Sequence, residues 1–128
     1  MQYNDEKDYI MRMIKEVSRV LFSILLGKKY VRVEMEEENK YGVSGKRLDE
    51  YKAMIDRGDI NEAENILLED IDYGNTEEVA AAVLFYQYIS QKGEDFLRLN
   101  DYSEEEVLDG LKLLAERAGY KEVCDILI

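Results

Sequence analysis

The chain has 128 residues, of which 46% are hydrophobic, enough for one compact core and too few for two. Its net charge of −12 argues against DNA and RNA as partners, because phosphate binding needs a basic surface. Histidine is absent and cysteine occurs once, so one chain cannot assemble the usual zinc, haem or iron–sulfur ligand sets, or a triad with an imidazole base. We therefore expect a single domain over residues 1–128 that holds no metal or cofactor, has no catalytic residues and is not an enzyme.

The first predicted element is a long N-terminal helix over residues 1–27. Apolar residues from Ile10 to Ile24 follow spacings of four and three, which places them on one helical stripe: Ile10, Ile14, Val17, Leu21 and Ile24. Gly27 supplies a natural stop. The C-terminal half of this helix is apolar nearly all round, so it must be covered on more than one side.

The N-terminal segment does not have the features of a secretory signal, because Asp5, Glu6 and Asp8 precede the apolar helix. The longest dense apolar run, from Val20 to Leu26, is far below the roughly 20 residues needed to span a bilayer. We expect a cytoplasmic location, where a lone cysteine is unremarkable. Cys124 has apolar neighbours, which favours a small buried hydrophobic side chain over a reactive thiolate.

A charged connector is predicted over residues 28–45. Val31, Val33 and Met35 alternate with charged residues, which is a strand-like pattern, but an isolated strand would have no partner here. We therefore expect an extended arm or a disordered connector, with its glutamate run in solvent.

Further helices follow the connector, each marked by helical spacing of its apolar residues and by a capping residue or a glycine stop. The predicted helices cover residues 46–57, 59–73, 75–92, 103–118 and 120–128, with a short helical turn over 96–99. Asp59, Asn75 and Ser103 are the predicted N-caps. The fold class is all-α, a single-domain bundle of about six helices with antiparallel helical hairpins.

Two of these hairpins have a similar apolar pattern at an offset of 60 residues, either as a true repeat or through ordinary amphipathic periodicity. The segment Gly58–Leu67 resembles the turn and second-helix start of tetratricopeptide-type hairpins, which implies a helical hairpin at this point. Tyr51 stands where that pattern has a small residue, and the chain has no 34-residue period. The resemblance therefore implies hairpins and not a peptide-binding array.

Taken whole, the chain resembles a family of short, all-helical bacterial proteins of unknown function, found in Gram-positive anaerobes. The residues that carry the resemblance are Asp8–Ile14, Ile60–Asn65 and Leu84–Tyr86. Because no activity is known for that family, the resemblance assigns no functional residue.

Three candidate chemistries are set aside, the first two because their spacing does not fit. Asp70–Asn75 is similar to the start of a calcium loop, but Ala81 stands where the bidentate glutamate is needed. Gly42–Arg47 lacks the first glycine and the hydroxyl of a phosphate loop. The pair Glu77 and Glu78 lies in a first helical turn, where the helix dipole already favours negative charge.

The leading functional hypothesis is non-catalytic protein interaction, with self-association as one form of it. Its candidate residues are the apolar groups beside the first helix stripe: Met11, Leu21, Phe22, Leu25 and Leu26. Residues 1–33 carry a charge of +3 and the remainder −15, so this segment is expected to attract an acidic partner, including a second copy.

Two alternatives remain open. The first helix is amphipathic, with Arg12, Lys15 and Arg19 on its polar side, so it could lie on a membrane surface, although anionic lipid would repel the acidic remainder. The other alternative is an enzyme of unrecognised type.

Overall fold

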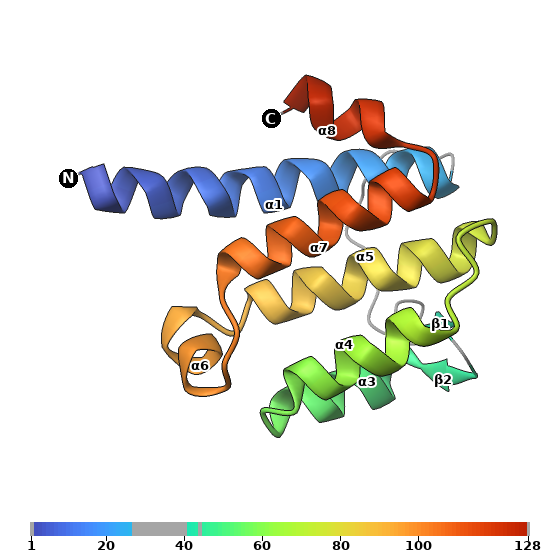
Figure 1. Cartoon of the computed structure of the whole chain (residues 1–128), viewed down its shortest axis with the longest axis horizontal. Helices are drawn as coiled ribbons and strands as arrows, with labels where there is room; N and C mark the ends of the chain where they lie inside the picture. Colours follow the sequence, from blue (N-terminus) through green and yellow to red (C-terminus); the bar gives the residue numbers. More distant parts are fainter. Residues whose placement is uncertain (1, 27–40, 44, 128) are drawn as a thin grey trace.

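The computed structural model describes residues 2–26, 41–43 and 45–127, with side chains from residue 8 onward. Its elements are α1 (Gln2–Leu26), β1 (Gly42–Val43), β2 (Lys46–Arg47), α3 (Leu48–Asp56), α4 (Ile60–Glu69), α5 (Thr76–Ser90), α6 (Glu94–Leu99), α7 (Glu104–Arg117) and α8 (Lys121–Leu127) (Figure 1). The predicted all-α class is confirmed. The predicted turn over 96–99 is a short helix of its own, α6.

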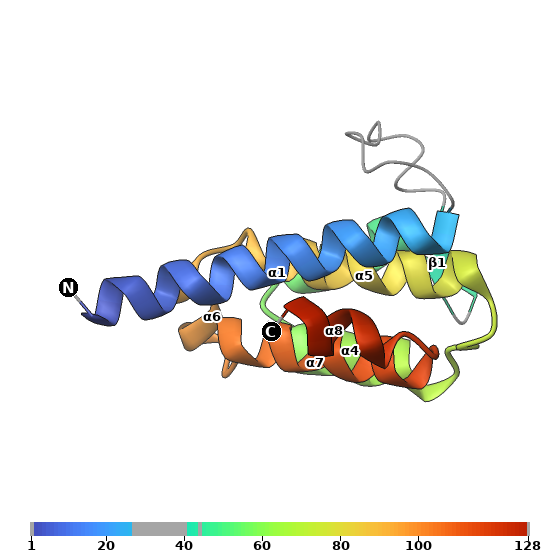
Figure 2. The same cartoon turned by 90° about the horizontal axis from the view of Figure 1, so that it is seen from above.

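Three helices form the centre of the bundle: α1, α5 and α7 all contact one another. The chain runs in one direction along α1 and α7 and in the opposite direction along α5 (Figure 1). Seen from above, α1 and α5 lie in one layer, while α4, α7 and α8 lie in the other (Figure 2). Since α7 contacts both helices of the first layer, the core lies between the layers.

Helix α5 is the most enclosed element. Every residue from Val79 to Tyr86 is buried, which is expected of a helix that is apolar all round. It contacts α1, α3, α7 and β1. The run Ala80–Ala82 has small side chains, and these allow neighbouring helices to approach closely.

The stripe predicted on α1 faces the core along most of its length. Ile14, Val17 and Leu21 are buried, and Ile10 packs against the core at its edge. Ile24 differs from the prediction, because 44% of it is exposed. The reason is that α1 contacts α5, α7 and α8. Its buried face is therefore wider toward the C-terminal end of the helix and no longer coincides with the predicted apolar stripe.

The last part of the predicted connector forms structure. Strands β1 and β2 pair antiparallel, with Val43 opposite Lys46, and Val43 is buried in the core. The hydroxyl of Tyr51 donates a hydrogen bond of 3.0 Å to the Val43 carbonyl. Burial, followed by the charge of Glu50, raises the pKa of Tyr51 to about 12, so this hydroxyl remains a donor at neutral pH. Residues 28–40, with the predicted period-two pattern, lie outside the described part of the chain.

The start of α3 follows from this hairpin. The helix begins at Leu48 rather than at residue 46, because Arg47 is extended and serves as the N-cap residue. Its backbone N–H donates to the Glu50 carboxylate over 2.9 Å. The predicted helix start was therefore two residues early.

All three predicted N-cap positions are confirmed, and at two of them the side chain makes the cap hydrogen bond. The Asn75 side chain accepts hydrogen bonds from the Glu77 and Glu78 amides over 3.0 and 3.2 Å, and Ser103 accepts one from the Glu106 amide over 3.2 Å. Asp59 is the N-cap residue of α4, but its side chain makes no cap hydrogen bond, so the predicted capping box does not form there.

The hairpins α3–α4 and α7–α8 share one turn geometry. Gly58 and Gly119 both have positive φ, 90° and 92°, which glycine adopts at little cost. In each turn the amide after the glycine donates to the carbonyl five residues earlier, the pattern of a Schellman motif. The internal similarity seen in the sequence thus corresponds to the same turn used twice.

Candidate functional site

The predicted interaction residues on α1 are mostly part of this chain's own core. Leu21, Phe22 and Leu25 are buried, with exposures of 0%, 3% and 7%, while Met11 and Leu26 are half-buried against the core. The prediction assumed that one domain could not cover so broad an apolar face. Contacts with α5, α7 and α8 do cover it, so Leu21, Phe22 and Leu25 are not available to a partner in this fold.

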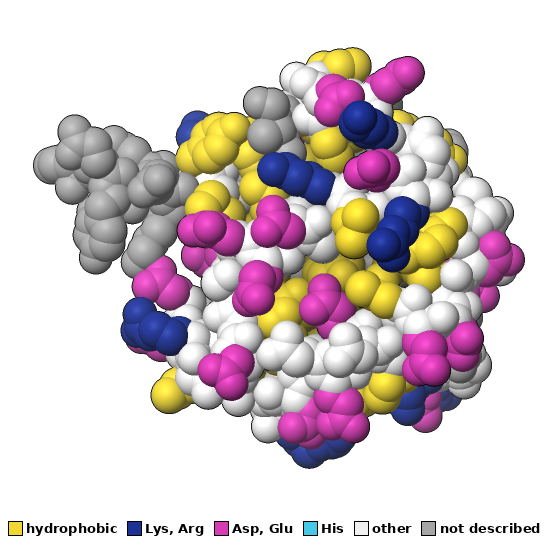
Figure 3. Space-filling model, viewed as in Figure 1, with side chains coloured by type: hydrophobic (Ala, Val, Ile, Leu, Met, Phe, Trp, Pro, Cys, Tyr) yellow, Lys and Arg dark blue, Asp and Glu magenta, His cyan; other side chains and the backbone are white. Residues whose placement is uncertain are grey.

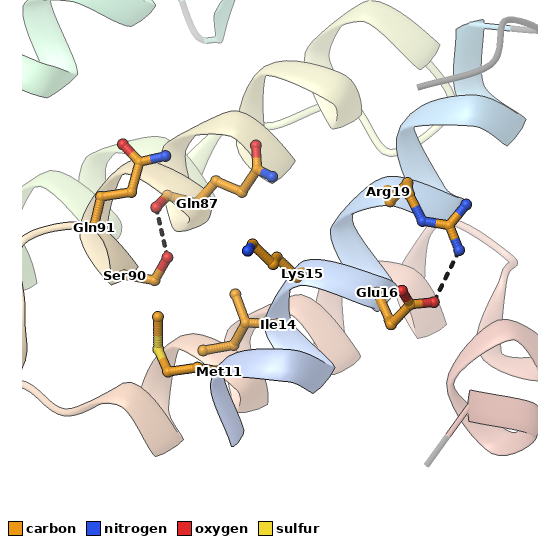
Figure 4. Close-up of a pocket in the computed structure, with 8 residues that line it drawn as sticks. All are labelled: Met11, Ile14, Lys15, Glu16, Arg19, Gln87, Ser90 and Gln91. Carbon is orange, nitrogen blue, oxygen red and sulfur yellow. Dashed lines mark hydrogen bonds and ion pairs between the residues drawn. The ribbon is translucent and has the colours of Figure 1, made fainter. Parts of the chain in front are cut away.

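A pocket of about 350 Å³ lies between α1 and α5 (Figure 4). Its lining comes from the middle of α1 and the C-terminal end of α5: Met11, Ile14, Lys15, Glu16, Arg19, Gln87, Ser90 and Gln91. This volume is at the lower end of the range for ligand pockets, about 300–1,000 Å³. Of the predicted interaction residues, Met11 lines this pocket.

Apolar side chains and a buried hydroxyl lie side by side in the pocket. Met11 and Ile14 approach Ser90 across the gap between the two helices (Figure 4). The Ser90 hydroxyl is buried and donates to the Gln87 carbonyl over 2.6 Å. The hydroxyl hydrogen is therefore already used in this hydrogen bond, and the oxygen can only accept a further one.

Charged and amide groups complete the lining. Glu16 and Arg19 pair with each other over 2.8 Å (Figure 4). Lys15 is exposed and forms no ion pair with any residue that the structure describes. Because Glu16 and Arg19 compensate each other, the pocket carries one uncompensated positive charge in a chain of net charge −12.

These groups can bind but are poorly suited to acid–base or nucleophilic chemistry. The Ser90 hydroxyl has no imidazole available to take its proton, because the chain contains no histidine. The single carboxylate, Glu16, is held by Arg19. An ammonium group, amides and an apolar surface are typical of a recognition site, where a few polar groups fix the orientation of an apolar ligand group.

Comparison with known proteins gives a family but no activity. The model of a family of unknown function (DUF6483) matches residues 4–119. The chain belongs to this family. No curated protein and no solved structure matches it. The resemblance to a family without known activity is thus confirmed, while the bacterial range and the local likeness to tetratricopeptide hairpins stay predictions.

A second cluster in this DUF6483 chain joins the C-terminal ends of α3 and α5. The Lys92 ammonium lies 2.5 Å from the Asp56 carboxylate, and the Tyr88 hydroxyl donates to the same carboxylate over 2.6 Å. These hydrogen bonds, that of Lys92 first, hold the pKa of Asp56 below its usual value. Lys52 and Lys92 also lie 5.0 Å from the centre of the Tyr88 ring. This cluster fastens α3 to α5, and we assign it a structural role.

A third cluster is buried where α4, α5 and α7 meet. The Tyr86 hydroxyl donates to the Glu64 carboxylate over 2.7 Å, and burial followed by the charge of Glu64 raises the pKa of Tyr86 well above its usual value. Gly110 of α7 faces the Tyr86 ring so closely that a Cβ there would lie 2.4 Å from Cε1. This contact explains a glycine in the middle of a helix, and its role is again structural.

The structure also bears on the remaining candidates. Cys124 is buried, as predicted, and burial raises the pKa of its thiol. Among the described residues, no three or more Asp, Glu or Cys side chains are grouped to hold a metal ion. Within the same residues, no helix combines the length and the apolar character needed to cross a bilayer.

Sequence reasoning missed most of the pocket. Lys15 and Arg19 were predicted as part of a polar face, but Gln87, Ser90 and Gln91 had no signal, since amides and a serine near a helix end are common. The pocket depends on which faces of α1 and α5 meet, and that is decided by packing.

Proposed function

We propose that this chain is a non-catalytic protein-interaction protein and that the α1–α5 pocket is where its partner binds. The observation that carries the proposal is a concave site of about 350 Å³ whose apolar groups, Met11 and Ile14, lie beside the Lys15 ammonium group, which has no ion-pair partner among the described residues. Protein partners bind most strongly where an anchor side chain fills such a pocket and a polar rim surrounds it. The proposal keeps the cytoplasmic location expected from the sequence.

The same observations weigh against the two alternatives. Membrane-surface binding would need the apolar face of α1 to enter the lipid, but Ile14, Val17 and Leu21 are buried in the chain's own core. Catalysis would need a base, a nucleophile or a metal near the pocket. The lining offers the Ser90 hydroxyl, whose hydrogen is already bonded, and the Glu16 carboxylate, which is already paired with Arg19. Binding through the pocket requires no rearrangement of the fold.

Position-specific crosslinking in cells that produce the chain tests the proposal. A photoreactive phenylalanine analogue at position 91, an exposed residue of the pocket lining, should capture a protein partner. The same analogue at position 65, exposed on α4 and outside the lining, is the matched control and should not capture it. Absence of any protein crosslink at position 91, or the same products from both positions, would contradict the proposal.

Self-association is separated from a heterologous partner by light scattering. The burial of Leu21, Phe22 and Leu25 removes the main reason to expect a homo-oligomer through them. We therefore propose a partner other than a second copy, and expect the purified protein to have the monomer mass of 15.0 kDa at micromolar concentration. A stable dimer that dissociates on Lys15→Glu would instead place a second copy in the pocket.

A further inference from the structure

We infer that the α1–α5 pocket accepts one apolar anchor side chain presented by an acidic segment of the partner. This inference rests on the proposed function and adds the chemistry of the partner to it. The argument combines the charge around the pocket, the size of the pocket and the hydrogen-bonding groups of its lining.

Charge favours an acidic segment. Arg12, Lys15 and Arg19 are exposed and spaced at i, i+3 and i+7, so they share one side of α1. Among the described residues, Glu16 compensates the charge of Arg19, whereas Arg12 and Lys15 have no ion-pair partner. An approaching carboxylate therefore meets net positive charge at the pocket.

The rest of the molecule strengthens this preference. Asp and Glu side chains are spread over the face that carries α4, α7 and α8 (Figure 3). In a chain of net charge −12, such a face repels an acidic segment, whereas α1 attracts it. Electrostatic complementarity of this kind sets specificity and the rate of encounter more than the final affinity.

The apolar part of the pocket supplies the affinity. Met11 and Ile14 offer aliphatic contact, and the pocket volume of about 350 Å³ suits one large side chain better than an extended cofactor. Burying a leucine, phenylalanine or methionine in such a site is the usual role of an interface anchor. The anchor side chain and the acidic groups of the partner thus bind to different parts of one site.

The polar groups of the lining match a polypeptide. Gln91 presents both a donor and an acceptor, and the Ser90 oxygen accepts. A peptide backbone carries one donor and one acceptor per residue and needs both kinds of partner next to a buried anchor. A small ligand with an apolar tail and a carboxylate head group, by comparison, offers only hydrogen-bond acceptors.

The test is a random-peptide display selection on the full-length protein, with counter-selection on Met11→Trp, whose larger side chain occupies part of the pocket from the α1 wall. We expect enriched peptides in which Asp or Glu flank a single Leu, Met, Phe or Tyr. In fluorescence anisotropy the best peptide should bind about five- to tenfold more weakly to Lys15→Glu, because an exposed attraction becomes a repulsion. Lys121→Glu is the matched control, with the same residue change at an exposed position on α8 outside the pocket lining, and should change binding little.

The outcomes separate this inference from the proposed function. Peptides that bind in the pocket but are basic or neutral would overturn the acidic partner and leave the interaction function standing. Equal losses for Lys15→Glu and Lys121→Glu would also overturn it. Sedimentation with phosphatidylglycerol vesicles that depends on Lys15 would assign this face to lipid and overturn both. Circular dichroism of each variant verifies that it is folded, and Lys15→Glu alters an exposed side chain only.

Discussion

The close contact between α7 and α5 predicts that Gly110→Ala destabilises the protein, although alanine is the better helix former. A Cβ at position 110 would lie 2.4 Å from Cε1 and 2.6 Å from Cζ of Tyr86. Tyr86 has no exposed surface, and its hydroxyl donates to Glu64. The ring therefore cannot move away without disturbing both the core packing and this hydrogen bond.

The magnitude follows from three opposing contributions. Helix propensity favours alanine over glycine by about 1 kcal/mol. Overpacking a core costs about 1–3 kcal/mol, and weakening a hydrogen bond to a charged group costs up to about 1.5–3 kcal/mol more. These contributions sum to a net loss of up to about 5 kcal/mol in the free energy of unfolding, or roughly 3–6 °C in Tm for each kcal/mol lost.

Urea denaturation followed by circular dichroism measures the effect in a double-mutant cycle. The four proteins are the wild type, Gly110→Ala, Tyr86→Leu and the double variant. In the Tyr86→Leu background the shorter side chain removes the overlap, so Gly110→Ala should be neutral or stabilising by up to about 1 kcal/mol. Stabilisation of the wild type by Gly110→Ala, or the same cost in both backgrounds, would refute the reasoning.

Three further predictions concern other contacts. Since its ion pair with Lys92 lowers the pKa of Asp56, that stability is present at neutral pH and is lost progressively as the pH falls below about 4, so the difference between wild type and Asp56→Asn in urea denaturation should shrink steadily below that pH. Tyr51→Phe leaves the buried Val43 carbonyl without its donor and should cost about 1–2 kcal/mol, with faster hydrogen exchange in β1 and β2 as the local signature. Cys124 should react slowly with a thiol reagent in the native protein and quickly in urea, and rapid reaction without denaturant would contradict its burial on the inner face of α8.

Sequence patterns predicted the helices well where local signals were strong. The caps at Asn75 and Ser103 and the apolar periodicity of α1 depend on residues that are close in the chain, and their local chemistry is enough to specify them. The hairpin of β1 and β2 was missed because two-residue strands have no periodicity to detect. This hairpin becomes visible only in the tertiary structure, where Val43 is buried and its carbonyl accepts a hydrogen bond from Tyr51.

Of the five predicted interaction residues on α1, three are buried in the core and one, Met11, lines the proposed pocket. Phe22 and Leu25 looked surplus because their cover, α7 and α8, comes from residues some 80 or more positions away in the sequence. The pocket was invisible for a related reason, since its two walls join Lys15 with Gln87 and neither carries a signal by itself. Tertiary packing decided both points, and a single sequence read by itself offers little to anticipate it.

The order of the three central helices along the chain has a consequence during synthesis. Leu26 ends α1 and Thr76 begins α5, so 50 positions separate the first central helix from the second. At roughly 5–20 residues per second, a ribosome needs several seconds to synthesise the residues between the end of α1 and the start of α5. During that interval the apolar stripe of α1 has no native partner, and α7 arrives later still. The nascent chain therefore depends on late, long-range docking, and chaperones that shield apolar helices would be expected to meet its N-terminal segment first.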